Sequence, residues 1–298
     1  MIKRTLFFGN PAYLSTKNEQ LHISFPGADK ADRTVPIEDL GMIVLENQQI
    51  TITNGLLAKL TDSKVAVVSC NAQHLPEGLL LPMRGHTEQT ERVRYQLEAS
   101  QPLKKNLWQQ TITAKIKNQY ALLLEKGKES KRMEYLYKNV SSGDTGNHEA
   151  QAAAIYWQSL FDIADFNRGQ AGIPPNNLLN YGYAILRAVI ARCLVSSGML
   201  PGVGIWHRNK YNAFCLADDI MEPYRPYVDL VVSYIVENQD EYAELSTDLK
   251  KELLNIPALD VKIDGQKSPL MVAASRTTSS LFECFAGISR KIIYPEYG

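Results

Sequence analysis

The sequence predicts an α+β protein in which a small N-terminal β-sandwich domain precedes a larger all-helical domain. Over the first seventy or so residues, short β-branched or aromatic runs alternate with turn residues at spacings of about 8 to 12. From about Thr87 to about Lys291 the apolar residues recur at helical spacing instead. A polar stretch with Pro and Gly separates the strand-like region from the region with helical spacing. We therefore expect the sandwich over 1–75, a linker over 76–88 and the helical domain over 89–298.

The first domain should consist of short strands separated by Gly, Pro, Asn and Asp. A short helix is expected within ITNGLLAKLTDSK, residues 52–64, because this segment lacks the alternation of a strand. The extended runs that predict the strands are 4–9, 12–18, 20–25, 33–37, 41–47, 50–60 and 64–70.

Three helices dominate the prediction for the second domain. The first begins after SSGDTGN, which offers N-cap residues, and covers 148–164 with Glu149 in its first turn. The second covers 176–198, is apolar almost all round, and should be a core helix that ends at Gly198. The third begins near Leu216 and continues into YVDLVVSYIVEN, since Pro223 and Pro226 are tolerated near its first turns.

Length and composition indicate a soluble globular protein with a cytoplasmic location. The chain has 298 residues and is 45% hydrophobic, enough for two domains with sizeable cores. We find no apolar run that approaches the roughly 20 residues needed to cross a bilayer, and the N-terminus is a poor signal peptide. The four scattered cysteines form no CxxC pair, which favours buried reduced thiols over disulfides or zinc ligands.

The net charge of zero hides a basic segment. Between Arg92 and Lys138 there are eleven Lys or Arg and four Glu, a local balance of 11 − 4 = +7, so the rest of the chain carries −7. A phosphate-binding face requires such a concentration of positive charge. A solvated helical face rich in Lys also explains this concentration of charge, and charge alone favours the solvated face over a phosphate-binding face.

The stretch 206–226, WHRNKYNAFCLADDIMEPYRP, gathers groups that could bind a metal. Asp219 and Glu222 are spaced i and i+3 on the expected helix, and Asp218 and Glu222 are spaced i and i+4. Converging carboxylates repel, and a divalent cation relieves that repulsion; an added imidazole shifts the preference from Mg²⁺ toward Mn²⁺. Acids at a helix start also interact favourably with its dipole, and His207 alone would more often be a turn or core residue. The spacing alone does not decide between a metal site and a structural role for these residues.

A family resemblance decides between them. The chain resembles, over nearly its full length, the CRISPR-associated integrase of spacer acquisition, the metal-dependent endonuclease of the adaptation machinery. That family has an N-terminal β-sandwich that forms a dimer and a larger helical catalytic domain. The residues that carry the resemblance are GNHEAQAAAIYW (146–157), FNRGQAGIPPNNLLNYGYAILRAVI (166–190) and GIWHRNKYNAFCLADDIMEPYRPYVD (204–229).

The resemblance implies a catalytic set. A Glu at a helix start, a His and an acid in the D-(I/L)-M-(E/D)-x-(F/Y)-R-P motif bind the metal in the family, and these match Glu149, His207 and Glu222. Asp219 is one turn away and is implied as a further metal ligand. Many members have Asp where this chain has Glu222, which leaves open how Asp219 and Glu222 share the metal. Glu at this position, with the chain length, resembles the branch of the type II systems.

The implied activity is insertion of short captured duplexes into a repeat array. The 3′-hydroxyl of the incoming strand attacks a phosphodiester of the repeat, helped by Mg²⁺ or Mn²⁺. The implied partners are double-stranded DNA, a second copy of the chain, and a small ferredoxin-like protein whose dimer bridges two integrase dimers. A stand-alone nuclease of DNA repair and a catalytically silent DNA-binding scaffold are the alternatives.

Several residues are candidates for DNA contacts or for support of the site. Within the basic segment the candidates are Lys115, Lys117, Lys126 and Lys128, which would follow phosphates without reading bases. Arg225 can pair with a neighbouring carboxylate, the preferred reading, or hold a phosphate. Tyr13 can stack on a base, although a sandwich residue is the favoured interpretation. Asn177 and Tyr181 are expected to support the site rather than to catalyse.

Overall fold

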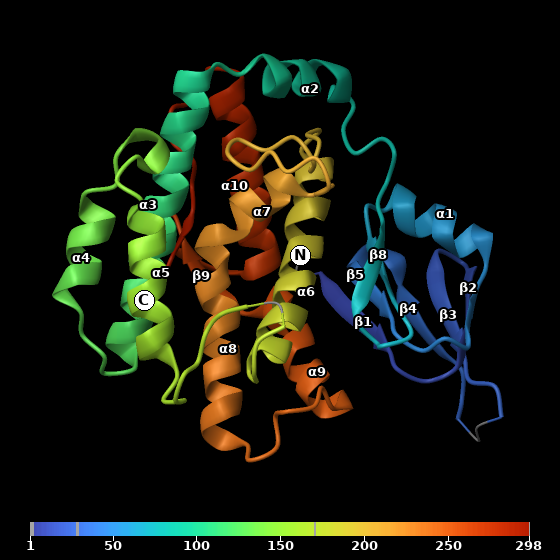
Figure 1. The fold of residues 1–298 in the computed structure, drawn as a ribbon. Coiled ribbons are helices and arrows are strands. Elements are labelled where there is room, and N and C mark those ends of the chain that lie inside the picture. The colour runs from blue at the N-terminus through green and yellow to red at the C-terminus, as the bar shows by residue number, and fades with distance from the viewer. Residues whose placement is uncertain (1–2, 28–29, 170, 298) are drawn as a thin grey trace. The chain divides into compact units, whose positions relative to one another are not determined.

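The computed structural model describes residues 3–27, 30–169 and 171–297. The chain divides into two compact units, Met1–Gly85 and His86–Gly298 (Figure 1). The first unit is rich in strands and the second is mostly helical, so the predicted α+β class is confirmed.

The first unit contains two four-stranded sheets and one helix. Helix α1 (Asn54–Asp62) begins where the side chain of Thr53 accepts a hydrogen bond from the backbone of Leu56, and it confirms the short helix predicted there. One sheet has the order β1 (Arg4–Phe8), β5 (Leu40–Leu45), β7 (Ala66–Cys70), β8 (Pro76–Leu80); the other has the order β4 (Arg33–Pro36), β3 (Gln20–Ser24), β2 (Ala12–Lys17), β6 (Ile50–Ile52).

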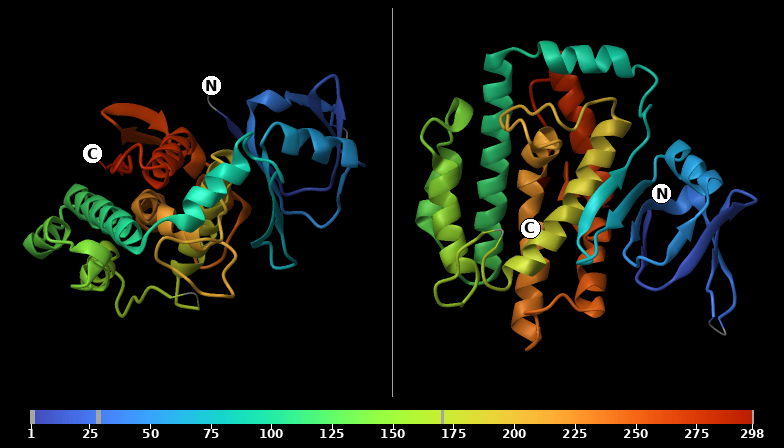
Figure 2. Two further views of the ribbon diagram at one scale, coloured as in Figure 1. Left: turned by 90° about the horizontal axis from the view of Figure 1, so that it is seen from above. Right: turned by 45° about the vertical axis from the view of Figure 1, so that its right-hand side comes forward.

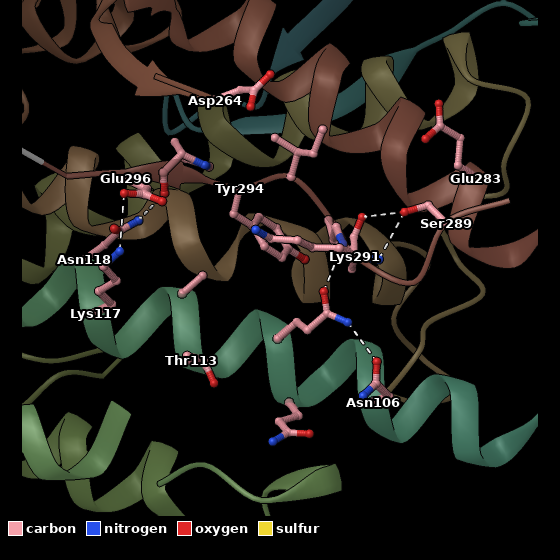
Figure 3. Close-up of a pocket in the computed structure, with 16 residues that line it drawn as sticks. Asn106, Thr113, Lys117, Asn118, Asp264, Glu283, Ser289, Lys291, Tyr294 and Glu296 are labelled. Carbon is pink, nitrogen blue, oxygen red and sulfur yellow. Dashed lines mark hydrogen bonds and ion pairs between the residues drawn. The ribbon is translucent and has the colours of Figure 1, made fainter. Parts of the chain in front are cut away.

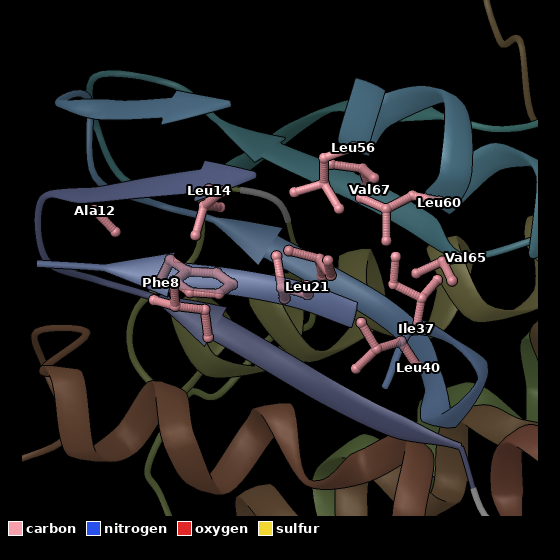
Figure 4. Packing of buried hydrophobic residues seen from close by; sticks show 12 residues of the cluster. Phe8, Ala12, Leu14, Leu21, Ile37, Leu40, Leu56, Leu60, Val65 and Val67 are labelled. Atoms are coloured by element: carbon pink, nitrogen blue, oxygen red, sulfur yellow. The ribbon is translucent and has the colours of Figure 1, made fainter. Parts of the chain in front are cut away.

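The core of the first unit lies between the sheets and α1. Strand β5 pairs in parallel with both β1 and β7 and is buried along almost its whole length, which explains its continuous apolar sequence LGMIVL. Figure 4 shows Leu14 and Leu21 from one sheet pointing toward Leu40 from the other, with Leu56 and Leu60 of α1 covering them.

Residues 76–80 correct the predicted linker over 76–88. They form β8, which pairs antiparallel with β7 and places Leu79 opposite Val68 and Leu80 opposite Val67. Pro and Gly in PEGLL suggested a turn, but Pro76 is the first residue of an edge strand, where its missing N–H costs no ladder bond.

The second unit is built on helices. Its α-helices are α2 (Gln89–Glu98), α3 (Gln101–Glu125), α4 (Lys131–Lys138), α5 (His148–Leu160), α6 (Asn176–Ser196), α7 (Cys215–Met221), α8 (Arg225–Asn238), α9 (Thr247–Leu254) and α10 (Leu270–Phe285). It also contains a small sheet of order β10 (Gln266–Pro269), β9 (Asp260–Ile263), β11 (Pro295–Glu296). The second domain is therefore not all-helical as predicted, since a hairpin turning at Asp264 and Gly265 forms two of these strands.

Helix α6 lies at the centre of the second unit. It packs against α8 and α10, and Figure 2 shows these long helices side by side with α3. By length and composition its 21 residues could cross a membrane, contrary to the sequence-based expectation. However, 78% of its most apolar 18-residue stretch is buried inside the protein, so α6 is the core helix that was predicted.

The cysteines fit the prediction of reduced thiols. All four are free, and Cys193, Cys215 and Cys284 are buried. None of them lies beside the catalytic candidates described next, except Cys215 at the start of α7.

Candidate active site

Lys115 contacts two of the predicted catalytic residues, Glu149 and Glu222, and both carboxylates act electrostatically on the third, His207. Glu149 lies in the first turn of α5, His207 in the loop before α7, and Glu222 in a 3₁₀ turn (Glu222–Tyr224) between α7 and α8. Lys115, which lies on α3, was not predicted to belong to the site. The structure thus brings the three predicted catalytic residues into the same region.

Lys115 joins two of the catalytic candidates. Its Nζ lies 2.7 Å from Glu149 Oε1 and 2.6 Å from Glu222 Oε2, and the residue is only 8% exposed. Burial disfavours the charge, but the Glu222 and Glu149 carboxylates raise the pKa of Lys115 above its ordinary value. The ammonium is therefore charged and interior, and this burial argues against the predicted contact of Lys115 with DNA phosphates.

The start of α5 is held by Asp144, a residue that the sequence did not single out. Its two carboxylate oxygens accept hydrogen bonds from the backbone N–H groups of His148 and Glu149, each at 2.9 Å. Asn147, just before the helix, has a φ of 52° and makes no side-chain cap, so Asp144 satisfies the free donors of the first turn. This fixes the backbone from which the Glu149 side chain reaches Lys115.

His207 is oriented by a fully buried carboxylate. Its Nδ1 lies 2.6 Å from Asp219 Oδ1, and Asp219 also accepts from the backbone N–H groups of Ile205, Trp206 and His207 at 2.7, 3.0 and 3.2 Å. The hydrogen bond to Asp219 raises the pKa of His207, partly offset by burial. Because Nδ1 is engaged, Nε2 is the ring atom left to bind a metal or substrate.

The loop around His207 depends on close packing. Trp206 stacks on Trp108 of α3, with ring centroids 5.3 Å apart and planes 3° from parallel. A Cβ on Gly204 would lie 2.4 Å from the carbonyl oxygen of His207 and 2.7 Å from Asp219 Oδ2. Only glycine fits there, so both the stacking and Gly204 help to fix the imidazole.

The surroundings of Asp219 favour a positioning role over the predicted role as a metal ligand. It is 0% exposed, and both of its oxygens already accept hydrogen bonds from the His207 loop. The i, i+3 spacing to Glu222 did not reveal this, because the chain tightens into a 3₁₀ turn at Glu222. Asp219 acts through His207 as a positioning residue.

Glu222 is buried but charged. It is 5% exposed, and Arg225 Nε donates to its Oε1 at 2.9 Å, which is the carboxylate pairing preferred for Arg225. Burial alone would raise the pKa of Glu222, but the charges of Arg225 and Lys115 lower this pKa to about 2. Its Oε2 is buried without a hydrogen bond of acceptable geometry, despite the nearby ammonium.

The residues fit a divalent metal, although the site is not preformed. Among the described residues, no three His, Cys, Asp or Glu side chains are grouped closely enough to hold an ion as they stand. Nevertheless, Glu222 Oε2 lacks a hydrogen bond, Lys115 places a cation between two carboxylates, and both carboxylates act electrostatically on His207. Two carboxylates and one imidazole suit Mg²⁺ or Mn²⁺.

A buried network behind the site ties three helices together. Asp229 of α8 accepts hydrogen bonds from Tyr156 of α5 at 2.8 Å and from Tyr183 of α6 at 2.5 Å. Asn118 of α3 donates to the carbonyl of Pro223 at 2.8 Å, next to Glu222. The sequence offered no signal for either role, because each partner is distant along the chain.

The other predicted contact residues lie elsewhere. Lys117, Lys126 and Lys128 pair with Glu296, Glu237 and Asp162 respectively, so each has an acidic neighbour besides solvent. Tyr13 is 52% exposed on β2 of the first unit, and Asn177 donates to the carbonyls of Tyr242 and Ala243. Tyr181 is buried in α6. DNA binding by the three lysines and by Tyr13 stays a prediction.

A pocket of about 750 Å³ lies between α3 and the C-terminal segment (Figure 3). Lys117, Asn118 and Tyr294 line it, but none of Glu149, His207 and Glu222 does. This pocket is therefore separate from the catalytic candidates.

Comparisons with known proteins show the family to which the chain belongs. Residues 6–255 match the family described as CRISPR associated protein Cas1. The CRISPR-associated endonuclease Cas1 of Neisseria meningitidis serogroup C (strain 8013) is 39% identical over 94% of this chain and 91% of its own length. The CRISPR-associated endonuclease Cas1 1 of Francisella tularensis subsp. novicida (strain U112) is 34% identical over 59% of this chain and 63% of its own length.

Solved structures share the fold. A casposase bound to an integration product superposes with a TM-score of 0.80 at 20% identity, over 100% of this chain and 95% of that one. A Cas1 protein from Thermotoga maritima gives 0.73 at 13% identity, over 95% and 97%. A Cas6-RT-Cas1–Cas2 complex also gives 0.73 at 20% identity, over 97% of this chain and 35% of that one.

Proposed function

Because this chain belongs to the Cas1 family, the endonuclease and integrase of CRISPR spacer acquisition, we propose that Glu149, His207 and Glu222 are its catalytic metal ligands. The observation that carries the proposal is the meeting of two carboxylates from α5 and the 3₁₀ turn around a buried positive charge. An imidazole held by Asp219 lies in the same electrostatic environment. The Glu at position 222 supports assignment to a type II system.

The reaction exchanges one phosphodiester for another. The 3′-oxygen of the captured strand forms a bond to the phosphorus of the repeat, the bond to the repeat's own 3′-oxygen breaks, and the attacking hydroxyl's proton passes to solvent while the leaving oxygen gains one. A bound Mg²⁺ or Mn²⁺ supplies polarisation of the scissile phosphate and stabilises charge on the entering or leaving oxygen.

The protein's own residues hold this geometry. Asp219 fixes the tautomer and direction of His207, so that Nε2 faces outward. Arg225 fixes Glu222 through one hydrogen bond from Nε, which leaves its terminal nitrogens able to meet a phosphate. Asp144 fixes the first turn of α5 and thereby Glu149.

The proposed partners follow from the family and from neighbours in fold. One such neighbour is a casposase bound to an integration product, and another is a complex that contains Cas1 and Cas2. These support double-stranded DNA as substrate, together with an assembly of two dimers of this chain and a dimer of the small partner. The cytoplasm, where a chromosomal repeat array lies, is the proposed location.

The test is strand transfer of a labelled duplex into a repeat-bearing plasmid. Glu149→Gln, His207→Ala and Glu222→Gln should each abolish transfer in Mn²⁺ or Mg²⁺, because a site with so few protein ligands cannot lose one and still place the ion. Duplex binding should persist in each. Glu241→Gln, an exposed acid outside the site, is the matched control.

Two results would contradict the proposal. Wild-type transfer by Glu149→Gln or His207→Ala would show that these residues are not ligands. Degradation of the plasmid by the wild type without any integrated product would indicate a nuclease that acts alone. Thermal melting of each variant checks that lost transfer does not reflect unfolding.

A further inference from the structure

Lys115 occupies the place where two carboxylates would share a cation. Its Nζ is 2.7 Å from Glu149 and 2.6 Å from Glu222, and the ammonium is almost fully enclosed. A divalent ion bound by the same oxygens would sit about 2.0–2.6 Å from them. The two cations would therefore overlap or repel strongly, and both cannot hold this position together.

The contact with Glu222 is well suited to exchange. Glu222 Oε2 lies 2.6 Å from the ammonium, so this oxygen and the Lys115 charge form an ion pair that a divalent cation could replace. Arg225 continues to neutralise Glu222 when Lys115 moves away, since it binds the other oxygen. Loss of the ammonium thus does not leave Glu222 without a counter-ion.

A second position for the ammonium exists nearby. A cavity of about 150 Å³ is lined by Lys115 and Glu222, and also by Gln119, one turn further along α3. Arg168 and Arg225 line it too, so the ammonium would have to stay on the Gln119 side of the cavity, away from these cations. Gln119 is 2% exposed, and its buried Oε1 has no hydrogen-bond partner among the described residues. An unpaired buried acceptor is costly, and an ammonium swinging into the cavity would satisfy it.

We propose that Lys115 is a placeholder cation: it holds Glu149 and Glu222 together in the metal-free protein, and moves toward Gln119 when the divalent ion binds. The inference rests on the proposed metal site. It makes Lys115 a positioning residue that stabilises the empty site and competes with the metal for the two carboxylates.

Metal affinity tests the competition directly. Isothermal titration of the full-length protein with MnCl₂ should give a Kd about tenfold lower for Lys115→Gln than for the wild type, because the competing charge is gone. Lys115→Arg keeps the charge and should bind no more tightly than the wild type. Lys251→Gln, an exposed lysine paired with Asp248, is the control and should be unchanged. Unchanged or weaker Mn²⁺ binding by Lys115→Gln would overturn the proposal.

Thermal melting gives a second readout. Without metal, Lys115→Gln should melt below the wild type, since two facing carboxylates lose their shared counter-ion. With saturating MnCl₂ the melting temperature of Lys115→Gln should rise by more than that of the wild type, because stabilisation by a bound ion grows with the affinity for the ion. Equal gains in both proteins would count against the placeholder role.

The second position can be tested while Lys115 stays unchanged. Gln119→Leu removes that position and should weaken Mn²⁺ binding, because the displaced ammonium loses its hydrogen-bond acceptor. Unchanged Mn²⁺ binding by Gln119→Leu would overturn the proposal. If the wild type and Glu149→Gln bind Mn²⁺ equally, the metal site itself is wrong instead.

Discussion

Two acids three residues apart, Asp219 and Glu222, have opposite tasks because their surroundings differ. Asp219 faces four N–H donors of the His207 loop, whereas Glu222 faces two side-chain cations. Burial raises the pKa of Asp219, although its hydrogen bonds oppose the rise, while the cations lower that of Glu222. The sequence could show only that both acids were near a helix start.

Replacing Asp219 should therefore affect folding more than replacing a metal ligand does. Asp219→Asn places an amide against backbone N–H donors and should cost about 3 kcal/mol of unfolding free energy, because buried donors lose their acceptor. Glu149→Gln should cost much less, since Glu149 is partly exposed. Urea titrations of the two variants measure the difference. An Asp219→Asn protein as stable as the wild type, but unable to bind Mn²⁺, would restore Asp219 as a ligand.

At the residue level, matched motifs supplied the candidates Glu149, His207 and Glu222. The structure joins Glu149 and Glu222 through Lys115, and both carboxylates act electrostatically on His207, while their role as metal ligands stays a prediction. Lys115 was assigned to a surface because its neighbours in sequence are basic, and local charge does not reveal which face of α3 packs inward. Asp144 belongs to the SSGDTGN segment that was expected to offer N-cap residues, but the sequence did not show which of these residues caps α5. Gly204 was missed because its close contact with Asp219 forms only after folding.

At the scale of elements, periodicity located the main helices and most strands of the first unit. The misplaced linker at β8 and the small sheet formed by β9, β10 and β11 share one cause. Short strands of two to five residues have too few positions for a pattern, and their pairing is set by tertiary contacts.

The contacts between helices predict a pH dependence. Asp229 links α5, α6 and α8, and burial raises its pKa from 3.8 to about 6, although the Tyr183 and Tyr156 hydroxyls oppose the rise. The native state thus holds a proton that the unfolded chain releases between these values. This group's contribution to stability is complete below about pH 3 and is lost as the pH rises through 6, a total change of about 3 kcal/mol.

Asp229→Asn isolates that contribution, because the variant cannot titrate there. The unfolding free energy of the wild type minus that of Asp229→Asn should fall by about 3 kcal/mol in total from below pH 3 to above pH 7, with about 2 kcal/mol of this between pH 4 and pH 6. Denaturant titrations at pH steps measure both proteins. Parallel pH profiles would show that Asp229 is not protonated in the native state.

For the whole molecule, composition excluded little: zero net charge would argue against a DNA partner, yet the family acts on DNA. The change near residue 80 from short strand-like runs to helical spacing predicted two units, and the structure divides the chain after Gly85. What composition could not supply is the assembly, because association depends on which surfaces stay exposed after each unit has folded.

The first unit leaves such a surface. Its sheet of order β1, β5, β7, β8 ends at β8, and Leu75 and Leu80 are each 40% exposed beside that edge. Edge strands with exposed apolar side chains favour pairing with another chain. We therefore predict that the full-length protein alone is a homodimer at about 10 µM, with contacts mainly in the first unit.

Sedimentation velocity measures the assembly state. The double variant Leu75→Asp/Leu80→Asp should shift the dimer toward monomer, because two charges would be buried at the interface without partners. Tyr234→Asp places a charge on an exposed aromatic of the second unit, 60% exposed, and should stay dimeric. A monomeric wild type would refute the dimer, and dissociation by Tyr234→Asp alone would move the interface to the helical unit.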